Sequence, residues 1–155
     1  MEVLQGRPTD ETGRLEKEIA VYDLLDKLDI PFRRVDHVHA DTMEMCQEID
    51  QALGQDICKN LFLCNRQKTK FYLLLMPGDK PFKTKDLSAQ IGSSRLSFGG
   101  AEDMERLLNL TPGSVTVLGL MYDPDCQVTL LIDQDLYQQS AFGCHPCINT
   151  STVQF

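Results

Sequence analysis

The sequence contains no long hydrophobic run. A membrane-spanning helix needs about 20 predominantly apolar residues, and no run of even about 18 exists in this chain. The first residues, MEVLQGRPTDETGRLEKE, are polar and acidic, unlike a secretory signal or a transit peptide. We therefore predict a cytoplasmic protein with no membrane partner.

The chain also has few positive charges. It contains 15 Lys and Arg residues against 23 Asp and Glu residues, which gives a net charge of −8. A protein that grips nucleic acid along many phosphates is normally basic. The charge therefore argues against a broad nucleic-acid surface, but a site for one terminal nucleotide needs only one or two local cations.

Familiar catalytic motifs are absent. The chain has no G-x-S-x-G, no H-E-x-x-H and no P-loop. Cys144-His145-Pro146-Cys147 is a C-x-x-C, which can bind zinc or exchange thiols. A closed zinc site needs about four ligands, and no second pair exists. A redox C-x-x-C opens a helix, whereas this one lies in a predicted loop. We predict no metal and no cofactor, so an enzyme of this sequence would activate water or use a group of its substrate.

The other four cysteines do not suggest disulfides in a chain of this size. Three of them occur in apolar patterns and are predicted to be small core residues: Cys46, Cys58 and Cys64.

The composition is that of one globular domain. The chain has 155 residues, of which 42% are hydrophobic and 25% charged, and this length suits a single core. Short strands alternate with short helices and hairpins, which favours a mixed α+β fold. We therefore predict a single domain over residues 1–155, whose residues 1–11 form a loose N-terminal arm.

Hydrophobic periodicity predicts the elements of this domain. The first helix is expected over 13–28, capped by Thr12, and a second is capped by Asp41 or Thr42 and stopped by Gly54. A buried hairpin formed by 58–64 and 71–76 is expected at the centre of the sheet, and residues 110–120 are predicted to form a turn followed by an apolar strand. The remaining predicted helices are 84–91, 101–108 and a turn at 135–137; the remaining strands are 32–35, 96–98, 128–132, 141–143 and 150–155.

Lys59 stands at the mouth of the strand Cys58-Lys59-Asn60-Leu61-Phe62-Leu63-Cys64. Strand side chains alternate between faces, so Lys59 shares a face with Leu61 and Leu63 and not with Asn60. A lysine there either extends its stem to solvent or meets an anion at the edge of the core.

Two later segments help to decide whether Lys59 reaches solvent or meets an anion. In Pro112-Gly113-Ser114-Val115-Thr116, the glycine can adopt a positive φ, and the N–H groups of Gly113, Ser114 and Val115 can bind a carbonyl or carboxylate oxygen. The alternative is an ordinary turn into a strand. In the second segment, His145 is a base, a donor to substrate or a structural brace, and Asn149 can fix its loop.

Together these segments closely resemble the bacterial YbaK/ProX family, free-standing relatives of the editing domain inserted in prolyl-tRNA synthetases. The resemblance is collinear from about Leu15 to Val153. The segments that carry it are KNLFL at 59–63, RLSF at 95–98, LLNLTPGSVT at 107–116, HP at 145–146 and NTSTV at 149–153.

The resemblance implies a compact α+β domain with a curved, barrel-like sheet and flanking helices. It also implies an aminoacyl-tRNA deacylase that hydrolyses mischarged tRNA(Pro), above all alanyl-tRNA(Pro), in trans. Its partners would be the tRNA acceptor end and prolyl-tRNA synthetase. The predicted catalytic residues are Lys59, Gly113 and His145. The predicted substrate-binding residues are Asn60, Ser114, Val115, Thr116 and Asn149.

The sequence departs from the family at three places. Val117 replaces the proline of the family's G-x-x-x-P loop, Cys144 and Cys147 are unusual in the last loop, and relatives continue beyond the last strand. Val117, the acidic charge and the short C-terminus leave an alternative open, namely a non-catalytic module of the same fold that binds an amino acid, a nucleotide or a protein.

Overall fold

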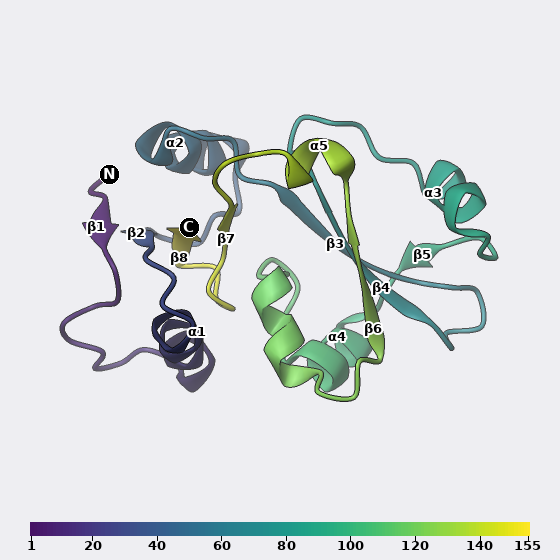
Figure 1. Ribbon diagram of the computed structural model, residues 1–155, viewed down its shortest axis with the longest axis horizontal. Helices are drawn as coiled ribbons and strands as arrows, with labels where there is room; N and C mark the ends of the chain where they lie inside the picture. Colours follow the sequence, from purple (N-terminus) through teal and green to yellow (C-terminus); the bar gives the residue numbers. More distant parts are fainter.

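Eight strands form two four-stranded sheets in the computed structural model, which describes residues 1–155 (Figure 1). The first sheet is antiparallel throughout, in the order β1 (Leu4–Gln5), β2 (Arg33–Asp36), β8 (Ser151–Gln154), β7 (Gly143–Cys144). The second is mixed, in the order β5 (Ser97–Phe98), β3 (Lys59–Cys64), β4 (Phe71–Met76), β6 (Val128–Ile132), with β4 and β6 parallel. The predicted α+β class is confirmed, but the strands form two open sheets and not one barrel-like sheet.

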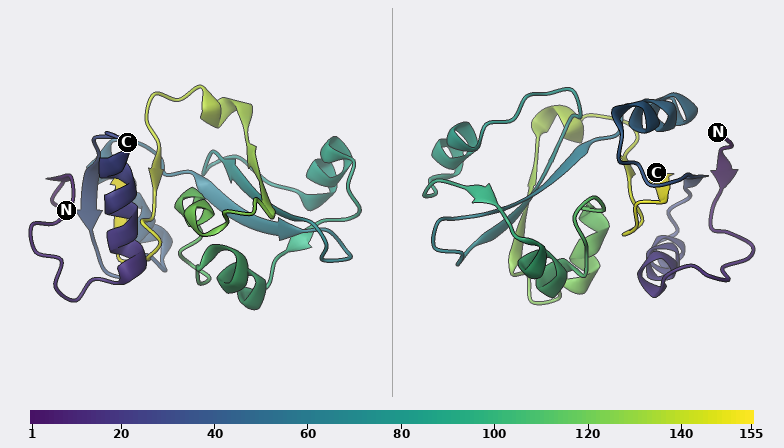
Figure 2. Two further views of the ribbon diagram at one scale, coloured as in Figure 1. Left: turned by 60° about the horizontal axis from the view of Figure 1, so that its bottom comes forward. Right: turned by 180° about the vertical axis from the view of Figure 1, so that it is seen from behind.

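Helices cover both sheets. They are α1 (Glu16–Lys27), α2 (Met43–Leu53), α3 (Thr84–Ile91), α4 (Ala101–Leu108), the 3-10 helix η1 (Val117–Tyr122) and α5 (Gln134–Tyr137). The helices α1 and α2 pack against the first sheet, whereas α3, α4 and η1 lie with the second (Figures 1 and 2). None of these helices is both long enough and apolar enough to cross a membrane.

The central hairpin forms as predicted. Strands β3 and β4 pair from Lys59 opposite Met76 to Cys64 opposite Phe71. The side chain of Asn65 closes the turn, because its Oδ1 accepts hydrogen bonds from the N–H groups of Thr69 and Lys70 at 2.9 and 3.1 Å. An apolar run that is covered on both faces stabilises the centre of a sheet.

The helix-capping residues seen in the sequence predict the ends of α2 and α3 correctly. Thr42 caps α2 through a 3.2 Å hydrogen bond from the Met45 N–H, and Gly54 ends it with a φ of 69°. Gly92 ends α3 in the same left-handed conformation, which glycine adopts without a Cβ penalty. The predicted Thr12 cap is wrong, since α1 begins after Leu15 without a side-chain cap and the Thr12 N–H instead bonds Asp10.

The apolar strand predicted within 110–120 is also wrong, because the apolar end of this segment forms η1. Thr116 starts the helix by accepting a 3.3 Å hydrogen bond from the Leu118 N–H. Gly119 allows η1 to lie directly against Leu110, where a Cβ would come within 2.6 Å of the leucine side chain. A short buried apolar run has no periodicity that separates a strand from a helix.

The N-terminal segment is not a loose arm. Leu4 pairs with Arg34, which adds β1 to the edge of the first sheet. Arg7 then forms ion pairs with three acidic side chains, those of Glu11, Asp23 and Asp26. These contacts hold residues 4–11 against β2 and α1.

The main core lies between the two sheets. It joins Tyr22 of α1, Phe62 of β3, Leu73 of β4 and Val153 of β8 within one cluster of 20 buried residues. The start of β3 reaches the first sheet there, where the Cys58 thiol lies 3.6 Å from the Gly143 carbonyl. This junction brings together the segments around Lys59, Gly113 and His145.

Candidate functional site

A cavity of about 220 Å³ lies at this junction. Its walls come from the three segments that the sequence singled out, and they comprise Ile57, Cys58, Asn60, Gly113, Val115, Cys144 and His145. The volume is below the range of about 300–1,000 Å³ that holds a drug-sized ligand. The cavity therefore suits a group of the size of one amino acid.

Lys59 is not among the residues that line this cavity. As the strand alternation predicts, its side chain leaves the opposite face of β3 from Asn60, and its ammonium group donates a hydrogen bond to the Lys80 carbonyl. A catalytic role for Lys59 stays a prediction.

Asn60 fixes the cavity wall to the start of η1. Its Oδ1 accepts a 3.1 Å hydrogen bond from the Val117 N–H, while its Nδ2 makes only long 3.5 Å contacts with Cys58. The Asn60 side-chain oxygen is therefore already hydrogen-bonded within the protein, whereas its NH₂ group makes only weak contacts.

The Gly113 turn lines the cavity with Gly113 and Val115. Gly113 has a φ of 92°, and a Cβ there would lie 3.4 Å from Asn149 Nδ2. The N–H and hydroxyl groups of Ser114 both bond the Thr111 carbonyl, and Thr116 is occupied as the cap of η1. The N–H groups of Gly113 and Val115 have no acceptor within the chain, so they are the donors that remain for a ligand.

His145 is held as a neutral ring. Its Nδ1 lies 2.9 Å from the Ser151 carbonyl, and because a carbonyl only accepts, Nδ1 carries the proton and Nε2 keeps a lone pair. Burial lowers the pKa of His145, the bond to Ser151 opposes that effect, and nearby His37 lowers the pKa further. The ring can therefore accept a proton at neutral pH.

Asn149 does not line the small cavity but braces the loops beside it. Its Nδ2 donates to Asp41 at 3.3 Å and its Oδ1 accepts from the Ala40 N–H at 3.1 Å. It also lines a second, larger cavity of about 620 Å³, formed by the continuation of the same two loops. Arg14, Lys17 and His39 line this second cavity, and no motif in the sequence singles out any of them.

The cysteine thiols of the small cavity are not activated nucleophiles. Burial raises the pKa of Cys58 to about 11 and raises that of Cys144 strongly as well. Both thiols stay protonated and act as small wall groups. The core placement predicted for Cys58 and Cys64 is confirmed, whereas Cys46 is exposed, because the first turn of α2 lies at the surface.

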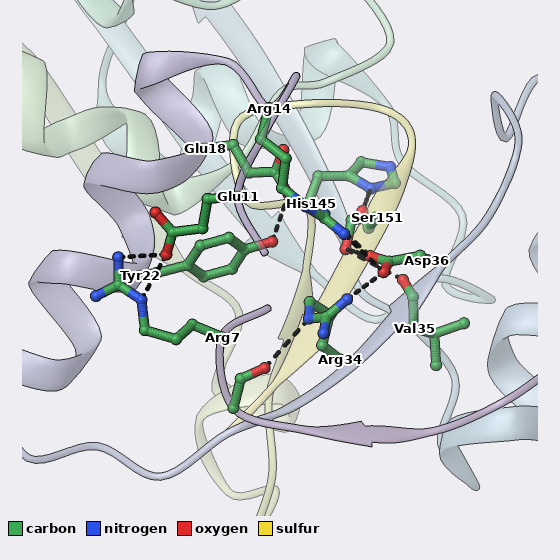
Figure 3. A network of polar contacts seen from close by, with 11 residues as sticks. Arg7, Glu11, Arg14, Glu18, Tyr22, Arg34, Val35, Asp36, His145 and Ser151 are labelled. Carbon is green, nitrogen blue, oxygen red and sulfur yellow. Dashed lines mark hydrogen bonds and ion pairs between the residues drawn. The ribbon is translucent and has the colours of Figure 1, made fainter. Parts of the chain in front are cut away.

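Beneath His145 lies a polar network that sequence reasoning missed (Figure 3). The Asp36 carboxylate accepts hydrogen bonds from Arg14 at 2.9 Å, from Arg34 and from the Ser151 hydroxyl at 3.0 Å. Burial would raise the pKa of Asp36, but the two arginines outweigh this effect and lower the pKa to about 2. Arg14 also pairs with the buried carboxylate of Glu18 at 2.6 Å.

The structure is thus a two-sheet α+β domain with a small cavity at the junction of its sheets, lined by the Gly113 turn and by His145. The chain belongs to the aminoacyl-tRNA editing domain family, whose pattern matches residues 37–155.

Individual relatives agree with this family. The prolyl-tRNA editing protein ProX of Acetoanaerobium sticklandii is 32% identical over 139 residues, covering 90% of this chain and 85% of that protein. The prolyl-tRNA synthetase associated domain-containing protein 1 of Danio rerio is 28% identical, covering 90% of this chain and 75% of that protein. A crystal structure of a putative trans-editing enzyme for prolyl tRNA synthetase superposes with a TM-score of 0.66 at 16% identity, covering 91% and 87% of the two chains, which confirms the fold.

Proposed function

We propose that this protein is an aminoacyl-tRNA deacylase that hydrolyses mischarged tRNA(Pro), and alanyl-tRNA(Pro) in particular, in trans. The family and the similarity to a prolyl-tRNA editing protein support the substrate class. The observation that carries the proposal is the small cavity, which is lined by Gly113 and Val115, whose N–H groups have no acceptor within the chain, and by the neutral ring of His145.

The proposed reaction is hydrolysis of the ester that joins the amino acid to the terminal ribose. The N–H groups of Gly113 and Val115 bind the carbonyl oxygen and stabilise the negative charge that develops on it. Water attacks the carbonyl carbon, the bond to the ribose oxygen breaks, and the amino acid and a free ribose hydroxyl are released. His145 Nε2 accepts a hydrogen bond from the water or from the neighbouring ribose hydroxyl, so no protein nucleophile is required.

Selection for alanine follows from size. One methylene contributes only about 1–3 kcal/mol to binding, so a pocket cannot strongly prefer a smaller side chain by attraction. Rejection of a larger ring by collision is stronger, and the branched side chains of Ile57 and Val115 form rigid walls. We therefore expect alanine to be removed and proline to be spared.

The nucleotide part of the substrate needs a separate place, because the small cavity holds only the aminoacyl group. The polar cavity of about 620 Å³ is lined by neighbouring residues of the same loops and by Arg14 and Lys17. Lys59 would hold the terminal phosphate only after its long side chain leaves the Lys80 carbonyl. With a net charge of −8 and few phosphates neutralised, binding should depend weakly on salt.

A panel of tRNA(Pro) charged with alanine, cysteine, serine or proline tests the proposal. Purified protein is expected to release alanine and to leave prolyl-tRNA(Pro) intact. Absence of turnover for all three mischarged tRNAs would refute the enzyme and favour the non-catalytic module. Co-sedimentation with purified prolyl-tRNA synthetase tests the second proposed partner separately.

A further inference from the structure

Ser151 connects His145 to the first sheet from a position outside the cavity. It is the first residue of β8, lies opposite Asp36 of β2 and is completely buried. Its hydroxyl lies 3.1 Å from the Val35 carbonyl and 3.0 Å from Asp36 Oδ1, while its own carbonyl accepts the His145 Nδ1 proton. One residue therefore bonds the sheet through its side chain and the histidine through its backbone.

Asp36 is fixed in turn by two arginines. Arg34 contacts it from the same strand, and Arg14 reaches it from the segment before α1 while also pairing with buried Glu18 (Figure 3). Such charge-assisted hydrogen bonds are stronger than neutral ones. The acceptor of the Ser151 hydroxyl is therefore held from several directions, although neither Asp36 nor Ser151 lines the small cavity.

A second group competes for His145 Nδ1. The hydroxyl of Thr152 lies 3.5 Å from Nδ1 and 2.9 Å from His37 Nε2. His37 Nδ1 donates to the Val38 carbonyl, so its Nε2 accepts the proton of Thr152. If the Ser151 carbonyl moved away, the Thr152 hydroxyl could turn its proton from His37 Nε2 to His145 Nδ1, and the proton of the His145 ring would then reside on Nε2.

We propose that Ser151 and Asp36 are positioning residues that keep His145 in the tautomer with the proton on Nδ1. Their hydrogen bonds hold the Ser151 carbonyl in place, and this carbonyl selects the tautomer that leaves Nε2 as an acceptor. The catalytic consequence rests on the proposed function, because only a base at the cavity needs that lone pair. The tautomer itself does not depend on any activity.

Imidazole ¹⁵N–¹H NMR tests the proposal directly. The chain has three histidines, and His145→Asn identifies the His145 signals by their loss. In the wild-type protein, His145 is expected to show a protonated Nδ1 and an unprotonated Nε2. Wild-type spectra with the proton on Nε2 would overturn the proposal, and this result needs no variant to fold.

The variant Ser151→Ala removes the hydroxyl and with it the side-chain hydrogen bond that holds the Ser151 carbonyl in place. Its expected effects are a mixed His145 tautomer and a fall in kcat of at least about tenfold, with KM unchanged. Ser88→Ala is the matched control, because Ser88 is also buried and also makes two hydrogen bonds, to Thr84 and Leu96. It should reduce stability and leave both readouts unchanged.

Ser151→Thr retains the hydroxyl and should restore the tautomer and kcat. A folded Ser151→Ala protein with the wild-type tautomer or with unchanged kcat would overturn the positioning role. If the wild-type protein deacylates none of the tRNAs, the proposed function fails, and the NMR result alone still decides the tautomer.

Discussion

The hydrogen bond between Val117 and Asn60 yields a quantitative prediction, because Val117 stands where the resembled family has proline. Val117 is the first residue of η1, a position where proline fits a helix. Its N–H, however, donates to Asn60 Oδ1 at 3.1 Å, and proline has no N–H. Val117→Pro therefore deletes one hydrogen bond without requiring a different backbone path.

Two terms of similar size decide the effect on stability. The lost hydrogen bond should lower the free energy of unfolding by about 0.5–1.5 kcal/mol. Proline also restricts the unfolded chain, which raises the free energy of unfolding by about 0.4–1 kcal/mol. The net change should therefore stay within about 1 kcal/mol, which corresponds to a Tm change of about 2–4 °C for a chain of this size.

A double-mutant cycle isolates the hydrogen bond from the entropy term. Urea unfolding is measured for the wild-type protein, Val117→Pro, Asn60→Ala and the double variant. The entropy gain is the same in both backgrounds, so proline should be less destabilising in the Asn60→Ala background by about 0.5–1.5 kcal/mol. An equal effect of proline in both backgrounds would refute the assignment of this bond.

Three further predictions concern the site. Lys59→Ala should abolish deacylation while leaving Tm nearly unchanged, since a lysine at a strand end contributes little packing; full activity in the folded variant would exclude Lys59 as a functional residue. Gly113→Ala should lower stability by about 1–3 kcal/mol, because a side chain is strained at a φ of 92°, and should slow deacylation by up to about 10²–10³ if the N–H donors move; calorimetry and single-turnover rates measure the two effects. Since the pKa of His145 is lowered below its usual 6.5, kcat/KM should be constant above that pH and fall as the pH drops through the lowered pKa, whereas a fall beginning above pH 6.5 would contradict burial as the dominant effect.

Acid stability gives an independent test of the network. The pKa of Asp36 is about 2 in the folded protein against an ordinary value of 3.8. Its stabilising contribution is therefore complete above pH 3.8 and is lost as the pH falls towards 2. Asp36→Asn should remove this part of the pH dependence in urea unfolding, and an unchanged dependence would show that other carboxylates account for it.

Sequence reasoning succeeded where local signals determine the structure. Thr42 and Gly54 bound α2 because a cap and a left-handed glycine act within a few residues. The central hairpin was predictable because its apolar run needs burial on both faces. The segments around Gly113 and His145 were grouped into one site by the family resemblance, because neither segment carries a local signal of its own for a site.

Sequence reasoning failed where contacts between residues that are distant in the chain determine the local structure. β1 consists of two residues and exists only because β2 pairs with it. The segment that forms η1 is an apolar run whose conformation depends on its contact with Leu110. The role of Ser151 depends on Asp36, which is 115 residues away in the chain, so no spacing rule reveals it.

The central claim is that His145 acts through Nε2 in the small cavity, and His145→Asn tests it most directly. Asparagine can still donate from its side-chain amide to the Ser151 carbonyl, but it has no group equivalent to Nε2. Single-turnover hydrolysis of alanyl-tRNA(Pro) should slow by about 10²–10⁴ while the folded structure is retained. Hydrolysis at the wild-type rate by this folded variant would contradict the account.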